Sequence, residues 1–209
     1  CMKKNEEYIV TCIDDTDLNS GVVKIDDMVV FVPNLLIGEK AKIKIVKVNK
    51  KYAFGIIIQL LEPSINRQEL TCEVAKTCGG CQLQHMKYTY QLEYKYKHVK
   101  KLFDDIEVKP ILGMNTPWYY RNKAQFPVKI KDGNVLMGFY RQHSNDVVTC
   151  KECKIQDHAI NEVFSFIQNH ITLEMAEGLR HIFIRHSSTN EIQVVFIGKS
   201  EKPILSLSE

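Results

Sequence analysis

The sequence predicts a mainly β protein with an α+β part: a small N-terminal β-barrel followed by an α+β domain. Short β-branched runs separated by turn signals fill the region before residue 63, which is typical of a small closed sheet. One amphipathic helical repeat follows near residue 90, and alternating strand patterns return after residue 118. The 209 residues are 44% hydrophobic and 25% charged, a composition that can bury real cores.

The barrel strands are expected at 22–25, 29–32, 40–48 and 54–58. Within 40–48 the apolar and lysine residues alternate, so one face is buried and the other is basic. Asp26 and Asp27 predict a hairpin turn between the first two strands. Cys12 lies in a strand-like stretch and is expected to be a small core residue.

Breaks in these patterns divide the chain. Pro63 ends the barrel pattern, so the barrel is placed at 1–63 and a cysteine-rich segment without regular structure at 64–85. Tyr and Leu residues at helical spacing predict an amphipathic helix within 86–106, with a basic solvent face. The remainder, 107–209, is the α+β domain.

Within the α+β domain, alternation from Trp118 predicts a strand, and Pro127 suggests that this strand is an edge strand or carries a bulge. Asp132-Gly133 predicts a hairpin turn to the next strand. Asp157 is placed to cap a helix over the following dozen residues, and a last hairpin joins 181–185 to 192–197.

The strongest chemical signal is a set of cysteines: Cys72, Cys78 and Cys81 in one cluster, with Cys150 and Cys153 about seventy residues later. Thiolates are soft metal ligands, and Gly79 and Gly80 allow a tight turn that brings backbone N–H groups toward sulfur. No secretory signal or long apolar run is seen, so a cytoplasmic protein without a membrane span is expected. In that compartment disulfides are rare, which leaves a zinc site (slightly favoured by spacing), an iron–sulfur cluster or a non-metal role.

Several separate segments carry a resemblance to a known family. Cys72-x5-Cys78-Gly-Gly-Cys81, the helix motif Tyr88-x2-Gln91-Leu92, the run Trp118–Lys123 and the run Gly178–Ile182 resemble bacterial 23S rRNA (uracil-5-)-methyltransferases. The barrel, with Val22-Val23 through Pro33 and then Gly38-Glu39, is similar to the TRAM domain of those enzymes.

This resemblance implies a [4Fe-4S] cluster on Cys72, Cys78, Cys81 and Cys153, with zinc as the alternative metal and Cys150 as the competing fourth ligand. It implies methyl transfer from S-adenosylmethionine to C5 of a uracil in ribosomal RNA, by addition of a cysteine thiolate at C6. It also implies that the helix at 86–106 packs on a methyltransferase domain. The sequence shows no Gly-rich cofactor loop, so we expect only the N-terminal part of such an enzyme: monomeric, inactive alone, without the C-terminal catalytic domain, and using S-adenosylmethionine only at full length.

Two surfaces are predicted to contact RNA. One is the strand face with Arg121, Lys123 and Lys129, where Tyr119 could stack on an unpaired base. The other is the barrel, through Lys42 and Lys44. Because the net charge is only +3, the argument depends on where these cations lie, and solvated lysine faces are the alternative.

Three other functions fit the same residues. A stand-alone RNA-binding module with a structural zinc site would need no catalytic part. An iron–sulfur redox sensor would use the same cysteines. A methyltransferase acting on transfer RNA would differ only in its substrate.

Overall fold

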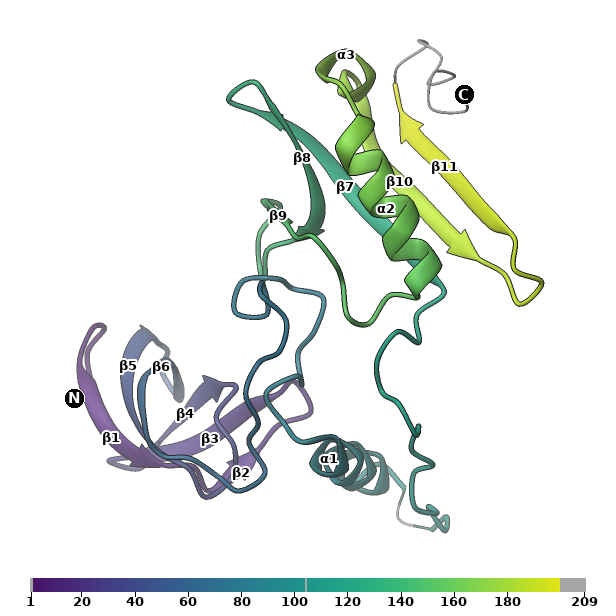
Figure 1. Ribbon diagram of the computed structural model, residues 1–209. Helices are drawn as coiled ribbons and strands as arrows, with labels where there is room; N and C mark the ends of the chain where they lie inside the picture. Colours follow the sequence, from purple (N-terminus) through teal and green to yellow (C-terminus); the bar gives the residue numbers. More distant parts are fainter. Residues whose placement is uncertain (1, 104, 200–209) are drawn as a thin grey trace. The chain divides into compact units, whose positions relative to one another are not determined.

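A computed structural model describes residues 2–103 and 105–199 and shows two compact units (Figure 1). The first unit comprises 1–69 with 82–113, and the second comprises 70–81 with 114–209. This division differs from the predicted domains. The cysteine-rich segment is split between the units, because 70–81 packs with the α+β domain while 82–85 stays with the barrel. Residues 200–209 of the predicted last domain lie outside the described residues.

The first unit is built on one curled sheet in the order β1-β5-β6-β4-β3-β2 (Figure 1). Its strands are β1 (Glu7–Thr11), β2 (Asp14–Asp15), β3 (Ser20–Ile25), β4 (Met28–Pro33), β5 (Lys40–Val48) and β6 (Tyr52–Glu62). All neighbours pair antiparallel except β4 and β6, which are parallel. The inward residues form a closed apolar core that includes Val30, Ile43, Ile45 and the predicted core residue Cys12.

The predicted barrel strands are confirmed, and so is the turn between β3 and β4. Asp26 and Asp27 have φ values of 44° and 65°, the left-handed conformation that a tight two-residue hairpin requires. The short edge strand β1 is not among the strands that the sequence predicts. It pairs with β5 from Glu7↔Lys44 to Thr11↔Lys40, so its position depends on a partner far along the chain.

The predicted helix is α1 (Tyr88–Lys100), and its buried side lies against the barrel of the same unit. Tyr94 is 6% exposed; its hydroxyl donates to the Thr16 carbonyl and accepts from the Asn19 N–H at 3.0 Å. Lys97 forms ion pairs with Asp14 and Asp15.

A second side of α1 meets the segment at 108–113. The Tyr96 hydroxyl donates to the Val108 carbonyl at 3.1 Å. A Cβ placed on Gly113 would lie only 2.8 Å from a methyl carbon of Leu92. The side of α1 that meets the barrel and the side that meets 108–113 thus have partners within the unit. The expected packing of this helix on a further domain remains a prediction.

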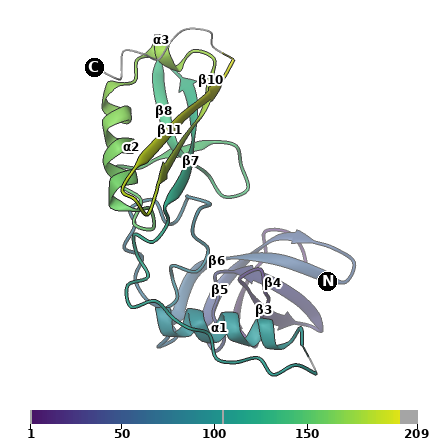
Figure 2. The same cartoon turned by 90° about the vertical axis from the view of Figure 1, so that its right-hand side faces the viewer.

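The second unit is a five-stranded sheet in the order β11-β10-β7-β8-β9, with all neighbours antiparallel (Figures 1 and 2). Its strands are β7 (Lys123–Lys131), β8 (Asn134–Tyr140), β9 (Val147–Thr149), β10 (Leu179–His186) and β11 (Ile192–Gly198). Its helices are α2 (His158–His170) and the short α3 (Leu173–Ala176).

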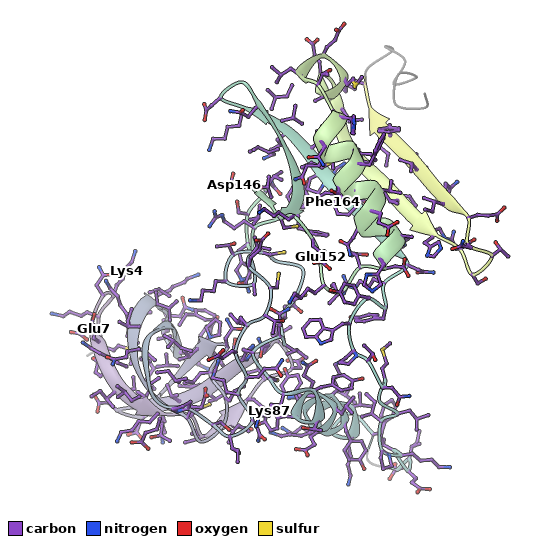
Figure 3. The ribbon with its side chains drawn as sticks, viewed as in Figure 1. Lys4, Glu7, Lys87, Asp146, Glu152 and Phe164 are labelled. Carbon is purple, nitrogen blue, oxygen red and sulfur yellow. The ribbon has the colours of Figure 1, made fainter. Side chains whose placement is uncertain are left out.

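Helix α2 covers one face of this sheet and closes the core. Phe164 points from α2 toward the sheet and stacks on Phe126 of β7, with ring centroids 4.2 Å apart (Figure 3). The predicted helix cap is confirmed, because the Asp157 carboxylate accepts a hydrogen bond from the Ala159 N–H at 2.8 Å. The predicted hairpin turn is also confirmed, with positive φ at Asp132 and Gly133.

The structure gives a different account of Pro127. Strand β7 is central, not an edge strand, yet it pairs with β10 over 123–127 and with β8 only from Val128 onward. Pro127 stands at the point where the pairing passes from one neighbour to the other. Its missing N–H therefore interrupts no continuous ladder. The predicted strand also starts later, at Lys123, because Tyr119 and Arg121 instead bond to the loop at 154–156.

No helix in the described part of the chain is long and apolar enough to cross a membrane.

A buried ion pair between Glu39 and Arg67 holds the segment that follows β6 against the barrel. Glu39 is fully buried, and its carboxylate accepts from the Leu36 N–H at 2.8 Å, the Ser64 N–H at 3.0 Å and the Arg67 guanidinium at 2.7 Å. Burial raises the pKa of Glu39, but the bonds from Arg67, Leu36 and Ser64 outweigh that effect and hold the pKa below its ordinary value of 4.5.

Because this pKa is lowered in the folded state, the pair stabilises the fold above pH 4.5, and that stabilisation is lost as the pH falls below it. Glu39→Gln leaves Arg67 without its anion, so we expect a loss of about 3 kcal/mol in the free energy of unfolding at pH 7. The loss should be smaller at about pH 3, because a larger fraction of the wild-type Glu39 is then protonated and its ion pair with Arg67 is already weakened. Urea unfolding at both pH values measures it. Glu62→Gln, which removes an exposed partner of Lys40, should change stability by less than about 0.5 kcal/mol. Equal losses for the two variants would contradict the assignment.

Candidate cysteine site and RNA-binding surfaces

The three clustered cysteines lie on a loop that is attached to the sheet of the second unit. Val74 packs against the core beneath α2. The Gly79 N–H donates to the Tyr140 carbonyl at 2.9 Å, and the Gln142 N–H donates to the Thr77 carbonyl at 3.0 Å. The approach is close at Gly79, where a Cβ would lie 3.2 Å from the Tyr140 carbonyl oxygen and would require a small shift of the backbone. These contacts hold Cys72, Cys78 and Cys81 at the end of β8.

Cys150 and Cys153 lie on the segment between β9 and α2, which is bonded to the loop of the three clustered cysteines. Cys150 follows β9, and the Lys151 N–H donates to the Glu73 carboxylate of the cysteine loop at 3.0 Å. Asn161 of α2 supports the turn after Cys153: its side-chain oxygen accepts from the Cys153 N–H at 2.9 Å, and its NH2 group donates to the Cys153 and Gln156 carbonyls. One unit therefore contains all five sulfurs.

Backbone N–H groups point at two of these sulfurs. The Gly80 N–H donates to the Cys78 sulfur at 3.3 Å. Burial raises the pKa of Cys153, while hydrogen bonds from the N–H groups of Ile155 and Gln156 act in the opposite direction. Burial likewise raises the pKa of Cys78, and the Gly80 N–H opposes it. Such N–H donors stabilise a negatively charged sulfur.

Cys81 and Cys150 differ in what surrounds them. Burial raises the pKa of Cys81 to about 11, with further contributions from Cys153 and Cys78, and the nearby Arg121 cation lowers it. Burial raises the pKa of Cys150 to about 12, and the neighbouring Cys153, Cys78, Cys72 and Glu73 raise it further. Cys150 is 5% exposed and belongs to the apolar core, whereas Cys153 is only partly buried. Cys150 is thus a core thiol in this structure.

The side chains are neighbours but do not form a closed coordination sphere. Among the described residues, no group of three or more His, Cys, Asp or Glu side chains is arranged to hold a metal ion. The structure therefore does not show the predicted metal or cluster. Cys153, Cys78 and Cys72 all lie near enough to Cys81 to help raise its pKa after the larger effect of burial.

The predicted RNA-binding residues lie in both units, and four of them belong to the second unit. Lys123 and Lys129 are exposed on β7, as expected. Arg121 precedes the strand and lies near the cysteine loop, where its charge acts on Cys81. Tyr119 already has partners: its ring stacks on His158 at 3.9 Å and its hydroxyl donates to Glu152 at 2.7 Å. One face of its ring is therefore occupied.

On the barrel, the two predicted lysines differ in their partners. Lys42 forms an ion pair with Glu7 at 2.7 Å. In the described chain Lys44 forms no ion pair, although its charge helps to lower the pKa of Glu7 after the larger effect of Lys42.

Sequence reasoning missed Asn161. Asn161 follows Ile160 of the predicted apolar stripe of α2, and only the structure shows that its amide is nine-tenths buried. Its importance depends on a turn eight residues earlier, which no periodicity indicates.

Comparison with known proteins identifies one domain and several relatives. Residues 4–58 match the TRAM domain. The chain is 42% identical to an uncharacterized RNA methyltransferase of Oceanobacillus iheyensis and 38% identical to one of Clostridium acetobutylicum, in each case over 96% of this chain and 47% of the relative. The chain thus spans about half the length of the curated relatives that it matches.

A more particular likeness comes from a solved structure. The fold is similar to the crystal structure of Pyrococcus abyssi tRNA (uracil-54, C5)-methyltransferase in complex with S-adenosyl-L-homocysteine. The TM-score is 0.61 at 25% identity, and the match covers 92% of this chain and 46% of the other. The predicted resemblance to RNA methyltransferases is therefore confirmed at that general level.

The same comparisons contradict the prediction of an N-terminal part that lacks its catalytic domain and is inactive alone. Similarity to proteins named RNA methyltransferase runs over 96% of this chain, and 92% of it matches a methyltransferase solved with S-adenosyl-L-homocysteine. The missing Gly-rich loop was the basis of that prediction. A motif that is absent from one stretch of sequence does not establish that a protein lacks a domain or an activity.

The difference between the buried thiols can be measured directly. At pH 8, a thiol with a pKa of about 12 is ionised in only about one molecule in ten thousand, so Cys150 should react with iodoacetamide more slowly than Cys81. Peptide mass spectrometry of the metal-free protein over time gives each rate. In urea the two rates should become equal, which controls for local sequence effects. Faster labelling of Cys150 than of Cys81 in the folded protein would contradict the core position of Cys150.

Proposed function

We propose that this chain serves the methylation of uracil C5 in ribosomal RNA, with S-adenosylmethionine as the methyl donor. The observation that carries the proposal is the fold likeness over 92% of the chain to a uracil-C5 methyltransferase of transfer RNA crystallised with S-adenosyl-L-homocysteine. S-adenosyl-L-homocysteine is the molecule that remains when S-adenosylmethionine has given up its methyl group. The two relatives named RNA methyltransferases support the same reaction class.

The cysteine motif favours ribosomal RNA as the substrate. Cys72-x5-Cys78-Gly-Gly-Cys81 resembles the motif of the 23S rRNA (uracil-5-)-methyltransferases, and it is joined to a TRAM barrel in the same order. Transfer RNA is the second candidate, and the substrate of the solved structural neighbour favours it.

We also propose that Cys72, Cys78, Cys81 and Cys153 hold a [4Fe-4S] cluster. The donor set fits, since thiolates bind iron and the N–H groups of Gly80, Ile155 and Gln156 point at two of the sulfurs. Zinc remains the alternative metal, and the likeness of Cys72-x5-Cys78-Gly-Gly-Cys81 to the motif of the 23S rRNA (uracil-5-)-methyltransferases is what favours the cluster.

When bound, the cluster would cross-link the 72–81 loop to the turn after Cys153. The chain's own residues prepare that turn: Asn161 fixes the backbone of Cys153, and Asp157 starts α2 directly after it. Arg121 provides a cation beside Cys81, where it would offset the negative charge of the thiolates.

RNA recognition is proposed for six residues of the two units: Tyr119, Arg121, Lys123, Lys129, Lys42 and Lys44. Arg121 is exposed and ordered by its backbone bond to Ile155. Tyr119 offers the ring face that His158 does not cover. Lys123 and Lys129 supply positive charge along β7, and cations of this kind would contact phosphates.

The substrate is tested by incubating the protein that carries this sequence with radiolabelled S-adenosylmethionine and either 23S rRNA or transfer RNA without modifications. We expect label in 5-methyluridine after nuclease digestion of the ribosomal RNA. Label only in transfer RNA would select the second candidate. No labelled 5-methyluridine in either RNA would contradict the proposal.

The ligand assignment predicts opposite results for two neighbouring cysteines. Cys153→Ser should abolish retention of iron and sulfide after anaerobic purification, together with the broad visible absorbance, because it removes a ligand. The matched variant Cys150→Ser should retain them, because Cys150 belongs to the apolar core. Full retention by Cys153→Ser with loss in Cys150→Ser would reverse the assignment, and a colourless wild-type protein with one zinc would contradict the cluster.

A further inference from the structure

Among the described residues of the second unit, one face of the sheet carries no helix. Helix α2 lies on one side, and Figures 1 and 2 show no helix of this unit on the other. Strand alternation directs Phe183 and Arg185 to that side, because the intervening Ile182 and Ile184 are buried toward α2. The register places Phe183 opposite Gln125 and Arg185 opposite Lys123 on β7. We call the side chains His181, Phe183, Arg185, Lys123, Gln125 and Tyr140 the open face.

Aromatic rings on the open face are held in place by their neighbours. The Tyr140 hydroxyl lies 3.0 Å from Nε2 of His181, and the two rings meet edge to face. The Lys123 ammonium lies 5.9 Å from the centre of the Phe183 ring. Tyr140 is 39% exposed and Phe183 is half-buried, so both rings can still be contacted from outside. The rings are therefore ordered and accessible.

The charge on these strands has one sign. Strands β7, β8, β10 and β11 contain no Asp or Glu, whereas β7 and β10 carry Lys123, Lys129, Lys131, Arg180 and Arg185. Within the described chain, neither Lys123 nor Arg185 forms an ion pair. An ordered ring beside unpaired cations matches a base flanked by phosphates.

We propose that the open face binds a single-stranded stretch of RNA, with Phe183 stacking on an unpaired base and Lys123 and Arg185 contacting the adjacent phosphates. This inference rests on the proposed function and specifies which form of RNA this sheet takes. A duplex would keep its bases stacked on one another and out of reach of the Phe183 ring. The apolar side chains of β11 beside this face would suit a protein partner, but they carry no charge that would explain the neighbouring cations.

The test uses fluorescence anisotropy of a labelled oligouridylate with the intact chain. Phe183→Leu keeps the apolar volume but removes the ring, so the dissociation constant should rise about fivefold or more. Phe183→Tyr should restore binding. The control is Phe166→Leu, which removes a more exposed ring from α2 on the other side of the sheet, and it should leave binding unchanged. Arg185→Gln should reduce the slope of log affinity against log salt by about 0.7.

A second measurement does not depend on how the variants fold. Ultraviolet crosslinking of an oligonucleotide that contains 5-iodouridine to the wild-type chain should label the peptide that contains Phe183. Unchanged affinity in Phe183→Leu, equal affinity for duplex and single strand, or crosslinks only outside β7, β8 and β10 would each overturn the inference.

Failure of this inference can be distinguished from failure of the proposed function. Arg121→Ala should weaken binding of a ribosomal RNA stem–loop, and Arg121 lies near the cysteine loop, away from Phe183. Loss of binding in Arg121→Ala together with no effect of Phe183→Leu on oligouridylate would overturn the inference alone. No binding of either RNA by the wild-type chain would contradict both.

Discussion

The candidate site depends on the hydrogen bonds that fasten the 72–81 loop to the end of β8. The N–H of Gly79 to the Tyr140 carbonyl, and the N–H of Gln142 to the Thr77 carbonyl, form a short ladder between segments more than sixty residues apart. Together with Val74 against the core and the bond from the Lys151 N–H to Glu73, this ladder sets where Cys72, Cys78 and Cys81 lie relative to Cys153. The same ladder orients Tyr140, whose carbonyl holds the loop and whose hydroxyl reaches His181 on the open face. One strand end thus links the cysteines to the proposed RNA surface.

The opposite side of the site is positioned by Asn161. The buried side-chain amide of Asn161 bonds to the backbone of Cys153 and Gln156, and the Gln156 N–H also donates to the Cys153 carbonyl, so the turn is held by several bonds. Asp157 then begins α2, and Phe164 of that helix anchors it on the sheet. The turn with Cys153 is therefore supported by the same helix that closes the core. This arrangement explains why Cys153 receives N–H donors, while Cys150, only three residues earlier, is buried among apolar side chains.

The two units bury their apolar cores in different ways. The barrel curls one sheet around its own apolar side chains and adds a buried Glu39–Arg67 pair and α1 at its margins. The second unit uses a five-stranded sheet with α2 on one face and the short α3, and within the described residues no helix covers the other face. A TRAM match covers the first unit's strands up to residue 58. The relatives named RNA methyltransferases align with both units.

The sequence by itself determined the features that depend on neighbours a few residues apart. Alternation predicted the barrel strands, helical spacing predicted α1 and α2, and the turns at Asp26-Asp27 and Asp132-Gly133 and the cap at Asp157 followed from local backbone chemistry. The tertiary structure decided which distant segments meet. It divided the cysteine-rich segment between two units, turned Tyr119 onto His158, made β7 a central strand despite Pro127, and placed Phe183 beside Lys123. Periodicity reports only which side of an element is buried, whereas these contacts join residues tens of positions apart and depend on the path of the whole chain.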